Sequence, residues 1–140
     1  MIDPQYLYIE DITVLQKHFY RMAGAQPQGL FTKSRAFKDL VIYSKDGFDF
    51  VRANGNGFSL SDRITESMKK PNRVVWRLSA TLPLPRGIIL VRDMTPDKIG
   101  HFMLAPAENM PLDKYLGLLQ EIVADGVRCL KLSYMEITNA

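Results

Sequence analysis

The sequence has few of the residues that build disulfides and metal centres. Its 140 residues include one cysteine, Cys129, and two histidines, His18 and His101. A lone cysteine cannot form an intrachain disulfide, and so few thiol and imidazole groups cannot supply the ligand spacing of a structural zinc site. We therefore expect no metal and no need for an oxidising compartment, with the cytoplasm as the place of action.

Long apolar segments are missing as well. The longest, residues 87–91, is much shorter than the roughly 18 residues that a membrane-spanning helix requires. The first residues do not combine a basic segment with an apolar one, so we expect neither a cleavable signal nor a membrane partner. The length and a hydrophobic content of 46% predict a single globular domain over residues 1–140.

The charge of the chain is only mildly basic, with a net charge of +3 from 18 basic and 15 acidic residues. A group of basic residues lies close together in sequence, namely Arg63, Lys69, Lys70, Arg73 and Arg77. Gathered on one face they would hold phosphates; spread over a loop they would simply be solvated. A nucleic-acid-directed toxin or RNA-binding domain is therefore an alternative function, though not the favoured one.

The familiar nucleotide and hydrolase motifs are absent. Residues 55–60 lack the third glycine of a dinucleotide-binding fingerprint and the lysine of a P-loop, and residues 57–61 lack the second glycine of a nucleophile elbow. Two successive Asn-Gly pairs at 54–57 favour positive φ angles instead. They predict a hairpin turn or a bulge whose backbone N–H groups can face a ligand.

The periodicity of apolar residues predicts a mixed α and β chain. Alternation favours strands near residues 39–43, 48–51, 73–78, 88–92 and 101–106, the first two joined by a turn at Asp46-Gly47. Apolar residues at helical spacing predict a helix from Pro111 to about Gly126. A short helix is expected at 64–68, while residues 11–20 and 127–136 fit either a helix or a strand.

Two blocks of the sequence carry a resemblance to a known family. The first runs from Asp39 through Gly57-Phe58-Ser59-Leu60-Ser61-Asp62-Arg63, and the second runs from Trp76-Arg77-Leu78 through His101 to Met110-Pro111-Leu112. In this order, over residues 36–123, they resemble the cytotoxic effectors delivered by type VI secretion that have an ADP-ribosyltransferase-like fold. That family includes stand-alone toxins neutralised by a partner protein.

The resemblance implies a compact α+β domain with a mostly antiparallel split sheet, flanking helices and a cleft that binds NAD as the cofactor. It also implies a bacterial toxin that arrests growth from within the cytoplasm of a target cell, reached without a cleavable signal. Its implied partners are a cognate immunity or antitoxin protein and a macromolecular acceptor that the sequence leaves unidentified.

Site residues follow from the same resemblance. The family's sensitive serine falls on Ser59 and its strand histidine on His101, and these two are the implied catalytic groups. The implied cofactor contacts are Ser59, Tyr20, Arg21, Asp62, Arg63 and Trp76. Nicotinamide leaves through an oxocarbenium-like state, so the site needs groups that hold the phosphates and the ribose more than it needs a strong base. Arginine suits the pyrophosphate because its planar guanidinium can donate two hydrogen bonds at once. The alternative is a purely structural role for two of them, with His101 as a hydrogen-bonded structural residue and Trp76 as part of the core.

The glutamates are where the chain departs from related transferases, which place a catalytic glutamate on a late strand. Glu108 is expected in a loop and Glu121 on the helix, so the sequence has no secure equivalent. NAD-dependent ADP-ribosyltransferase-like activity is the expected chemistry, but the sequence does not decide whether the chain turns over as an ordinary transferase. A non-catalytic interaction module, docking a partner on an apolar surface around Met103, Met110 and Leu112, is the other alternative.

Overall fold

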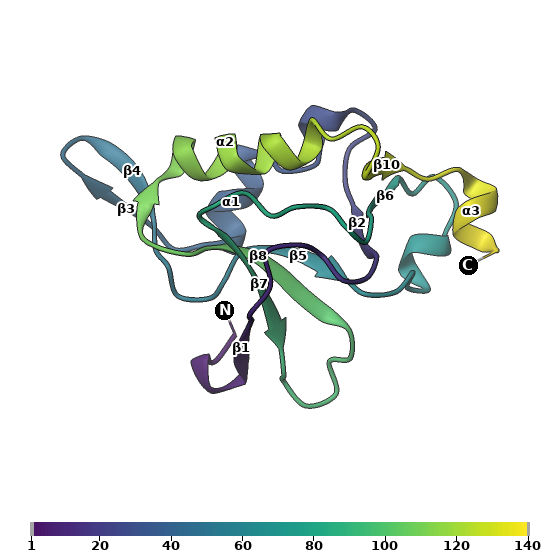
Figure 1. The fold of residues 1–140 in the computed structure, drawn as a ribbon, viewed down its shortest axis with the longest axis horizontal. Helices are drawn as coiled ribbons and strands as arrows, with labels where there is room; N and C mark the ends of the chain where they lie inside the picture. Colours follow the sequence, from purple (N-terminus) through teal and green to yellow (C-terminus); the bar gives the residue numbers. More distant parts are fainter. Residues whose placement is uncertain (1, 140) are drawn as a thin grey trace.

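The computed structural model describes residues 2–139. A seven-stranded sheet forms the main body, and α2 (Leu112–Val123) runs along one side of it (Figure 1). A three-stranded sheet of β3 (Ile42–Lys45), β4 (Phe48–Val51) and β9 (Met110–Pro111) extends from one end. All strand pairings among these residues are antiparallel. The α+β fold with mostly antiparallel sheets, expected from the sequence, is confirmed.

The main sheet has the strand order β1-β7-β8-β5-β2-β6-β10. Its strands are β1 (Leu7–Glu10), β2 (Phe19–Met22), β5 (Phe58–Ser61), β6 (Val75–Leu78), β7 (Ile88–Asp93), β8 (His101–Pro106) and β10 (Cys129–Lys131). The first and last strands of the chain therefore form opposite edges. Strands far apart in sequence, such as β5 and β8, become neighbours in the middle.

The main sheet is split between β2 and β5. Tyr20 opposite Ser61 is the one residue pair that joins these strands in the described part of the chain. By contrast, β2 pairs with β6 along the whole of Phe19–Met22, and β5 pairs with β8 along the whole of Phe58–Ser61. Beyond Tyr20 and Ser61 the two strands therefore diverge, and their facing edges lack the usual ladder of hydrogen bonds.

Helix α2 closes the core over one face of the main sheet. Its buried stripe is Leu112, Tyr115, Leu119 and Ile122, at the spacing that the sequence predicts. Burying an aliphatic side chain of this size contributes about 1.5–3 kcal/mol, so this stripe is a major part of the packing energy. The Tyr115 hydroxyl donates a 2.6 Å hydrogen bond to the carbonyl oxygen of Leu104, which ties α2 to β8. Burial raises the pKa of Tyr115, so this hydroxyl keeps its proton.

Several elements were missed or wrongly bounded by the sequence patterns. Helix α1 (Lys33–Asp39) was not predicted; Thr32 caps it by accepting a hydrogen bond from the backbone N–H of Arg35, and only Ala36 of the helix is buried. The strand expected at 39–43 begins at Ile42 for this reason. Residues 11–18 form no strand, the predicted helix at 64–68 is a 3₁₀ turn at Ser67–Lys69, and residues 129–138 hold first β10 and then α3 (Tyr134–Thr138).

The Asn-Gly segment does not form the predicted hairpin, because it connects β4 to β5 in two different sheets. Gly55 has φ of +85°, and a Cβ at Gly57 would collide with the carbonyl oxygen of Leu104. Gly57 is thus needed for a close approach of two backbones. The apolar docking surface expected around Met103, Met110 and Leu112 is also absent, since all three side chains are buried in the core clusters.

Candidate functional site

A cleft of about 470 Å³ lies where β2 and β5 separate. Its volume is within the usual range for small-molecule sites. The residues that line it are Tyr20, Arg21, Met22, Ala23, Gly29, Thr32, Arg35, Ser59, Leu60, Ser61, Thr65, Met68 and His101. Two arginines and several hydroxyl groups are among these residues, and no carboxylate is. The lining therefore suits an anionic ligand.

Ser59 and His101 meet at one wall of this cleft. Ser61 lies opposite His101 in the β5–β8 register, so Ser59, two residues away, shares the same face of the sheet. Oγ of Ser59 is 2.9 Å from Nε2 of His101. The other ring nitrogen of His101, Nδ1, is 2.7 Å from Oδ2 of Asp93, the last residue of β7. Three adjacent strands thus place a serine, a histidine and an aspartate in a hydrogen-bonded row.

Asp93 is the inner member of this row. Its side chain has 0% exposure, against 28% for His101, and its Oδ1 accepts a 2.9 Å hydrogen bond from the backbone N–H of Thr95. Burial by itself raises the pKa of Asp93, but the hydrogen bonds from Thr95 and His101 outweigh it and hold the pKa below its ordinary value. Because an ionised carboxylate only accepts hydrogen bonds, Nδ1 of His101 carries the proton that faces it.

Arg21 spans the gap between the separated strands. Its side chain, 9% exposed, donates from Nε to the carbonyl oxygen of Leu30 and from Nη1 to that of Ser59, both at 2.8 Å. The guanidinium also lies 5.3 Å and 5.0 Å from the ring centres of Phe31 and Phe58. Burial lowers its pKa to about 10, which leaves it charged at neutral pH. Arg21 takes the place of the missing ladder donor at Ser59 and fixes the width of the cleft.

Arg35 brings a second positive charge to the cleft from α1. Its Nε is 3.1 Å from Oδ2 of Asp39, one helical turn further on, and its side chain is about half exposed. Sequence reasoning missed Arg35 because α1 itself was not predicted. The Ser/Thr-rich start of this helix was the available signal, since Thr32 is a good N-cap residue.

Asp62 and Arg63 lie in a neighbouring cavity of about 300 Å³, together with Lys17 and Arg92. Asp62 is 3.0 Å from Nζ of Lys17 and 2.8 Å from Nε of Arg63. Burial by itself raises the pKa of Asp62, but the hydrogen bonds from Arg63 and Lys17 outweigh it and lower this pKa. The positive charge of Arg63 is therefore already paired.

Trp76 lies in the core rather than in the cleft. It is 5% exposed, and its indole N–H donates a 2.9 Å hydrogen bond to the carbonyl oxygen of Gly24. The structure therefore gathers Tyr20, Arg21, Ser59 and His101 at one cleft and leaves Trp76 outside it. Asp93 was missed by sequence reasoning, although its place at the end of a strand pattern was visible.

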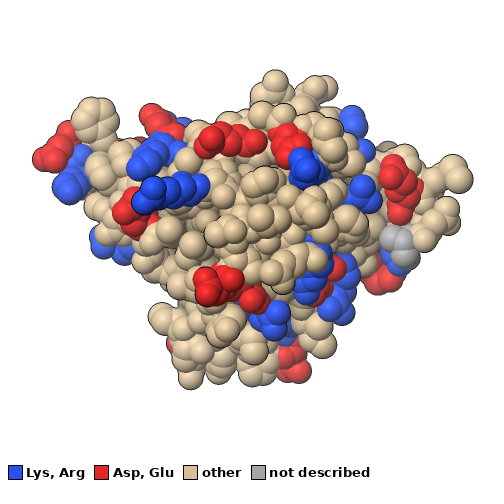
Figure 2. Space-filling model, in the orientation of Figure 1, with Lys and Arg blue, Asp and Glu red and all other residues tan. Residues whose placement is uncertain are grey.

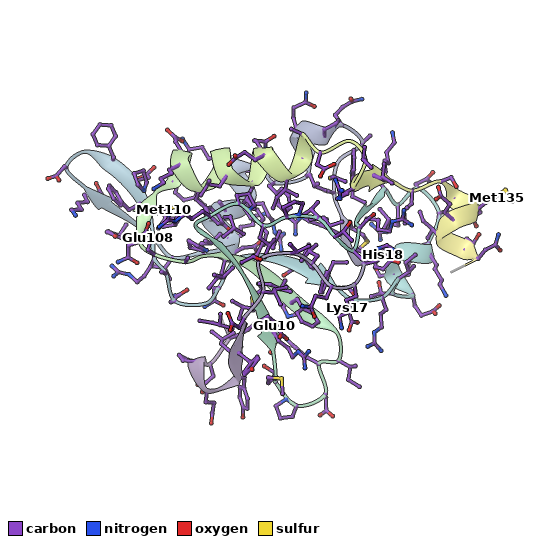
Figure 3. All side chains as sticks on the ribbon, in the orientation of Figure 1. Glu10, Lys17, His18, Glu108, Met110 and Met135 are labelled. Atoms are coloured by element: carbon purple, nitrogen blue, oxygen red, sulfur yellow. The ribbon has the colours of Figure 1, made fainter. Side chains whose placement is uncertain are left out.

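The two glutamates considered from the sequence do not line the cleft. Glu108 stands in the turn before β9, and Figure 3 shows it beside Met110 at the end of the molecule that carries the β3–β4 hairpin. Glu121 lies on α2, near a separate cavity at residues 82–85. Within residues 2–139 no group of three potential ligands could hold a metal ion, and no helix is long and apolar enough to cross a membrane.

Comparison with known proteins identifies a family. The family model described as Tse2 ADP-ribosyltransferase toxin matches residues 10–125, a range that includes all the residues lining the cleft. No curated protein matches the chain, and no solved structure does.

Proposed function

The chain belongs to the Tse2 ADP-ribosyltransferase toxin family, and from this premise we propose that it binds NAD in the cleft between β2 and β5 and consumes it, which arrests growth of a target cell. The observation that carries the proposal is the convergence of Arg21, Ser59 and His101 on one cleft at the split of the sheet.

The charge and the apolar surface of the cleft lining support the binding of NAD. Arg21 and Arg35 offer positive charge to a pyrophosphate. No carboxylate is among the residues that line the cleft, although Arg35 also pairs with Asp39 behind it. Met22 and Met68 supply flexible apolar surface against which a ring can pack. The hydroxyl of Ser59 is available to the ribose, because only His101 bonds to it in the described part of the chain.

The chemistry that NAD supplies is a glycosidic bond activated by its positively charged pyridinium, which leaves as neutral nicotinamide. The protein residues hold the phosphates, orient the ribose and present an oxygen to the carbon that becomes electron-poor. Arg21 is well placed for the first role because its two bonds to backbone carbonyls fix its position before a ligand arrives.

The first test is nicotinamide release from NAD by the purified chain, with and without cell extract. We expect Ser59→Ala to lower release by at least about 10²-fold and to abolish growth arrest on expression, because an oriented group at the reacting centre is lost. Ser44→Ala, an exposed serine in β3, is the matched control and should behave as the native chain. A folded Ser59→Ala that remains fully toxic would contradict the role of Ser59.

The expected partners belong to the same proposal. A toxin of this kind requires a cognate immunity or antitoxin protein in its producer, and it transfers ADP-ribose to a macromolecular acceptor in the cytoplasm of the target cell. A dependence of nicotinamide release on cell extract would indicate such an acceptor, and fractionation of the extract would then identify its chemical class.

The nucleic-acid alternative gains no support from the distribution of charge. On the face seen in Figure 2, lysine and arginine side chains alternate with aspartate and glutamate. Basic residues near the sites already described form ion pairs, as Lys17 does with Asp62 and Arg92 with Glu10. Binding to nucleic acid, if measured, should be weak and should fall steeply with salt.

A further inference from the structure

We propose that Asp93 is a positioning residue that acts through His101 to fix the direction of the hydrogen bond at Ser59, so that Oγ of Ser59 meets NAD as an acceptor only. The cleft then selects a ligand group that donates a hydrogen bond. In NAD that group is the carboxamide of nicotinamide or a hydroxyl of the attached ribose. This inference rests on the proposed function, since it names the ligand, and it adds a role for Asp93, which sequence reasoning did not single out.

The direction of the hydrogen-bonded row is set at its buried end. Oδ1 of Asp93 accepts a 2.9 Å hydrogen bond from the backbone N–H of Thr95, and Oδ2 lies 2.7 Å from Nδ1 of His101. An ionised carboxylate has acceptors and no donor, so the proton of this second bond belongs to Nδ1.

The imidazole passes this direction on to Ser59. With its proton on Nδ1, the neutral ring of His101 has a lone pair on Nε2, which faces Oγ of Ser59 at 2.9 Å. The hydroxyl of Ser59 therefore donates its one proton to Nε2. Only His101 bonds to Oγ in the described part of the chain, so the oxygen keeps acceptor capacity for a ligand.

The placement of the three groups keeps the direction fixed. Ser59 and His101 line the cleft, whereas Asp93 lies behind His101 and borders the neighbouring cavity. The side chain of Asp93 is fully buried and is also held by the backbone of Thr95, so it cannot swing into the cleft. Asp93 therefore influences a ligand in the cleft only through His101 and Ser59.

An oxygen that only accepts can distinguish ligands that a freely turning hydroxyl cannot. An N–H or O–H group on the ligand completes the hydrogen bond to Oγ of Ser59. A carboxylate or a fluorine in the same place sets lone pairs against lone pairs and leaves the oxygen without its partner. A site built to pair with one polar group rejects an analogue that lacks this group.

The substitution Asp93→Asn should reverse the row while keeping its length. The amide oxygen stays on the N–H of Thr95, so the amide nitrogen faces His101 and donates to Nδ1. The ring proton moves to Nε2, which then donates to Oγ of Ser59, and the serine hydroxyl turns its own proton toward the cleft. A change of tautomer is the expected result when the carboxylate that holds a histidine becomes an amide.

The test compares the dissociation constant of NAD with those of probes that cannot donate at one position. The probes are nicotinic acid adenine dinucleotide, in which a carboxylate replaces the carboxamide, and NAD with fluorine in place of the 2′- or the 3′-hydroxyl of the nicotinamide ribose. Calorimetry in the cold measures binding, and chromatography checks nicotinamide release over the same period.

We expect the native chain to bind one of these probes about 10- to 100-fold more weakly than NAD, the effect of a polar group left without its partner. Asp93→Asn should reduce this ratio about tenfold or more. The probe that shows the change distinguishes the carboxamide from the ribose as the source of the donor.

The Ser59→Ala background separates the hydrogen bond from the lost charge. Loss of the Asp93 carboxylate favours a negatively charged probe through its field alone, and this effect persists without Oγ. Asp93→Asn should therefore change the ratio about tenfold more in the native background than in Ser59→Ala. Asp49→Asn, the same exchange at an exposed position in β4, is the matched control and should keep the native ratio.

The tautomer of His101 gives a second readout that needs no ligand. ¹⁵N NMR of the imidazole should show the proton on Nδ1 in the native chain and on Nε2 in Asp93→Asn, with circular dichroism to check folding. If Asp93→Asn is unfolded, the native chain and Ser59→Ala carry the test: the native chain must have its proton on Nδ1, and Ser59→Ala must lose the discrimination against the probe.

Two kinds of failure can be told apart. Binding and consumption of NAD by a native chain that carries a proton on Nε2 of His101, or whose ratio is the same in Asp93→Asn, overturns the inference and leaves NAD consumption standing. A chain that neither binds NAD nor releases nicotinamide removes the proposed function, and the inference with it.

Discussion

The cleft and the neighbouring cavity are two polar regions near the end of β5, and Arg21 in the cleft differs from Arg63 in the cavity in whether a carboxylate bonds to it. In the neighbouring cavity, the carboxylate of Asp62 holds both Lys17 and Arg63. In the cleft, the guanidinium of Arg21 bonds only to neutral carbonyl oxygens, so its charge is not cancelled by a contacting carboxylate. A sequence shows that both regions contain arginine. Only the structure shows that, in the described part of the chain, Arg21 has no directly bonded carboxylate and Arg63 has one.

The largest expected difference between the two regions is in stability. Arg21→Ala removes a buried donor from two carbonyl oxygens and should lower the free energy of unfolding by roughly 2–5 kcal/mol. Arg63→Ala, at an exposed side chain, should leave the melting temperature nearly unchanged. Urea unfolding, monitored by the fluorescence of Trp76, measures the free energy of unfolding of both variants. Equal stability of the two variants would mean that Arg21 does not hold the split sheet together.

The pH dependence of stability should sharpen the comparison. Asp93 has a lowered pKa in the folded chain and an ordinary one, about 3.9, when unfolded. Its stabilising contribution is therefore complete above the unfolded value and is lost as the pH falls through the folded value.

Asp93→Asn should accordingly flatten the fall of the melting temperature as the pH drops below about 4. Asp62→Asn should flatten this fall less, since its partners Lys17 and Arg63 are about half exposed and solvent screens their charges. Melting curves at stepped pH values test this. Curves for Asp93→Asn that run parallel to those of the native chain would show that Asp93 is not the ionised partner of His101.

The smallest expected effect concerns Arg35. Because its side chain is about half exposed and shared with Asp39, Arg35→Ala should raise the KM for NAD only about two- to fivefold, the size typical of an exposed ion pair. Arg63→Ala serves as the comparison, since Arg63 was an expected cofactor contact and lies outside the cleft. A larger rise in KM for Arg63→Ala than for Arg35→Ala would move the pyrophosphate to the neighbouring cavity.

Local patterns in the sequence predicted the elements that depend on local physics. Alternation located β6, β7 and β8, and helical spacing located α2, because each of these buries a continuous apolar face. The Asp46-Gly47 turn helped to locate β4, which buries only Val51. Helix α1 was missed since it buries only Ala36 and so has almost no amphipathic pattern. The Asn-Gly segment was misread because its positive φ serves a connection between two sheets, which no local rule distinguishes from a hairpin.

The candidate site was predictable only in part, for a reason of topology. Ser59 and His101 could be chosen from the family resemblance, but Asp93 joins them through the order β7-β8-β5, which pairs strands from distant parts of the sequence. Asp62 and Arg63 follow directly after β5, and the chain has left the strand by then. Because they lie one and two residues beyond the end of β5, their side chains line the neighbouring cavity and not the cleft.

The weak connection between β2 and β5 also affects how far the two halves of the main sheet can move relative to each other. In the described chain, β2 and β5 are joined by the Tyr20–Ser61 pair and by the bond from Arg21 to the carbonyl oxygen of Ser59. We expect so few links to let the two halves of the sheet rotate slightly against each other. A ligand that contacts both halves would reduce this rotation, and the lost conformational entropy would lower its affinity. Amide hydrogen exchange along the facing edges of β2 and β5 should therefore slow when the cleft is occupied, even if the average structure does not change.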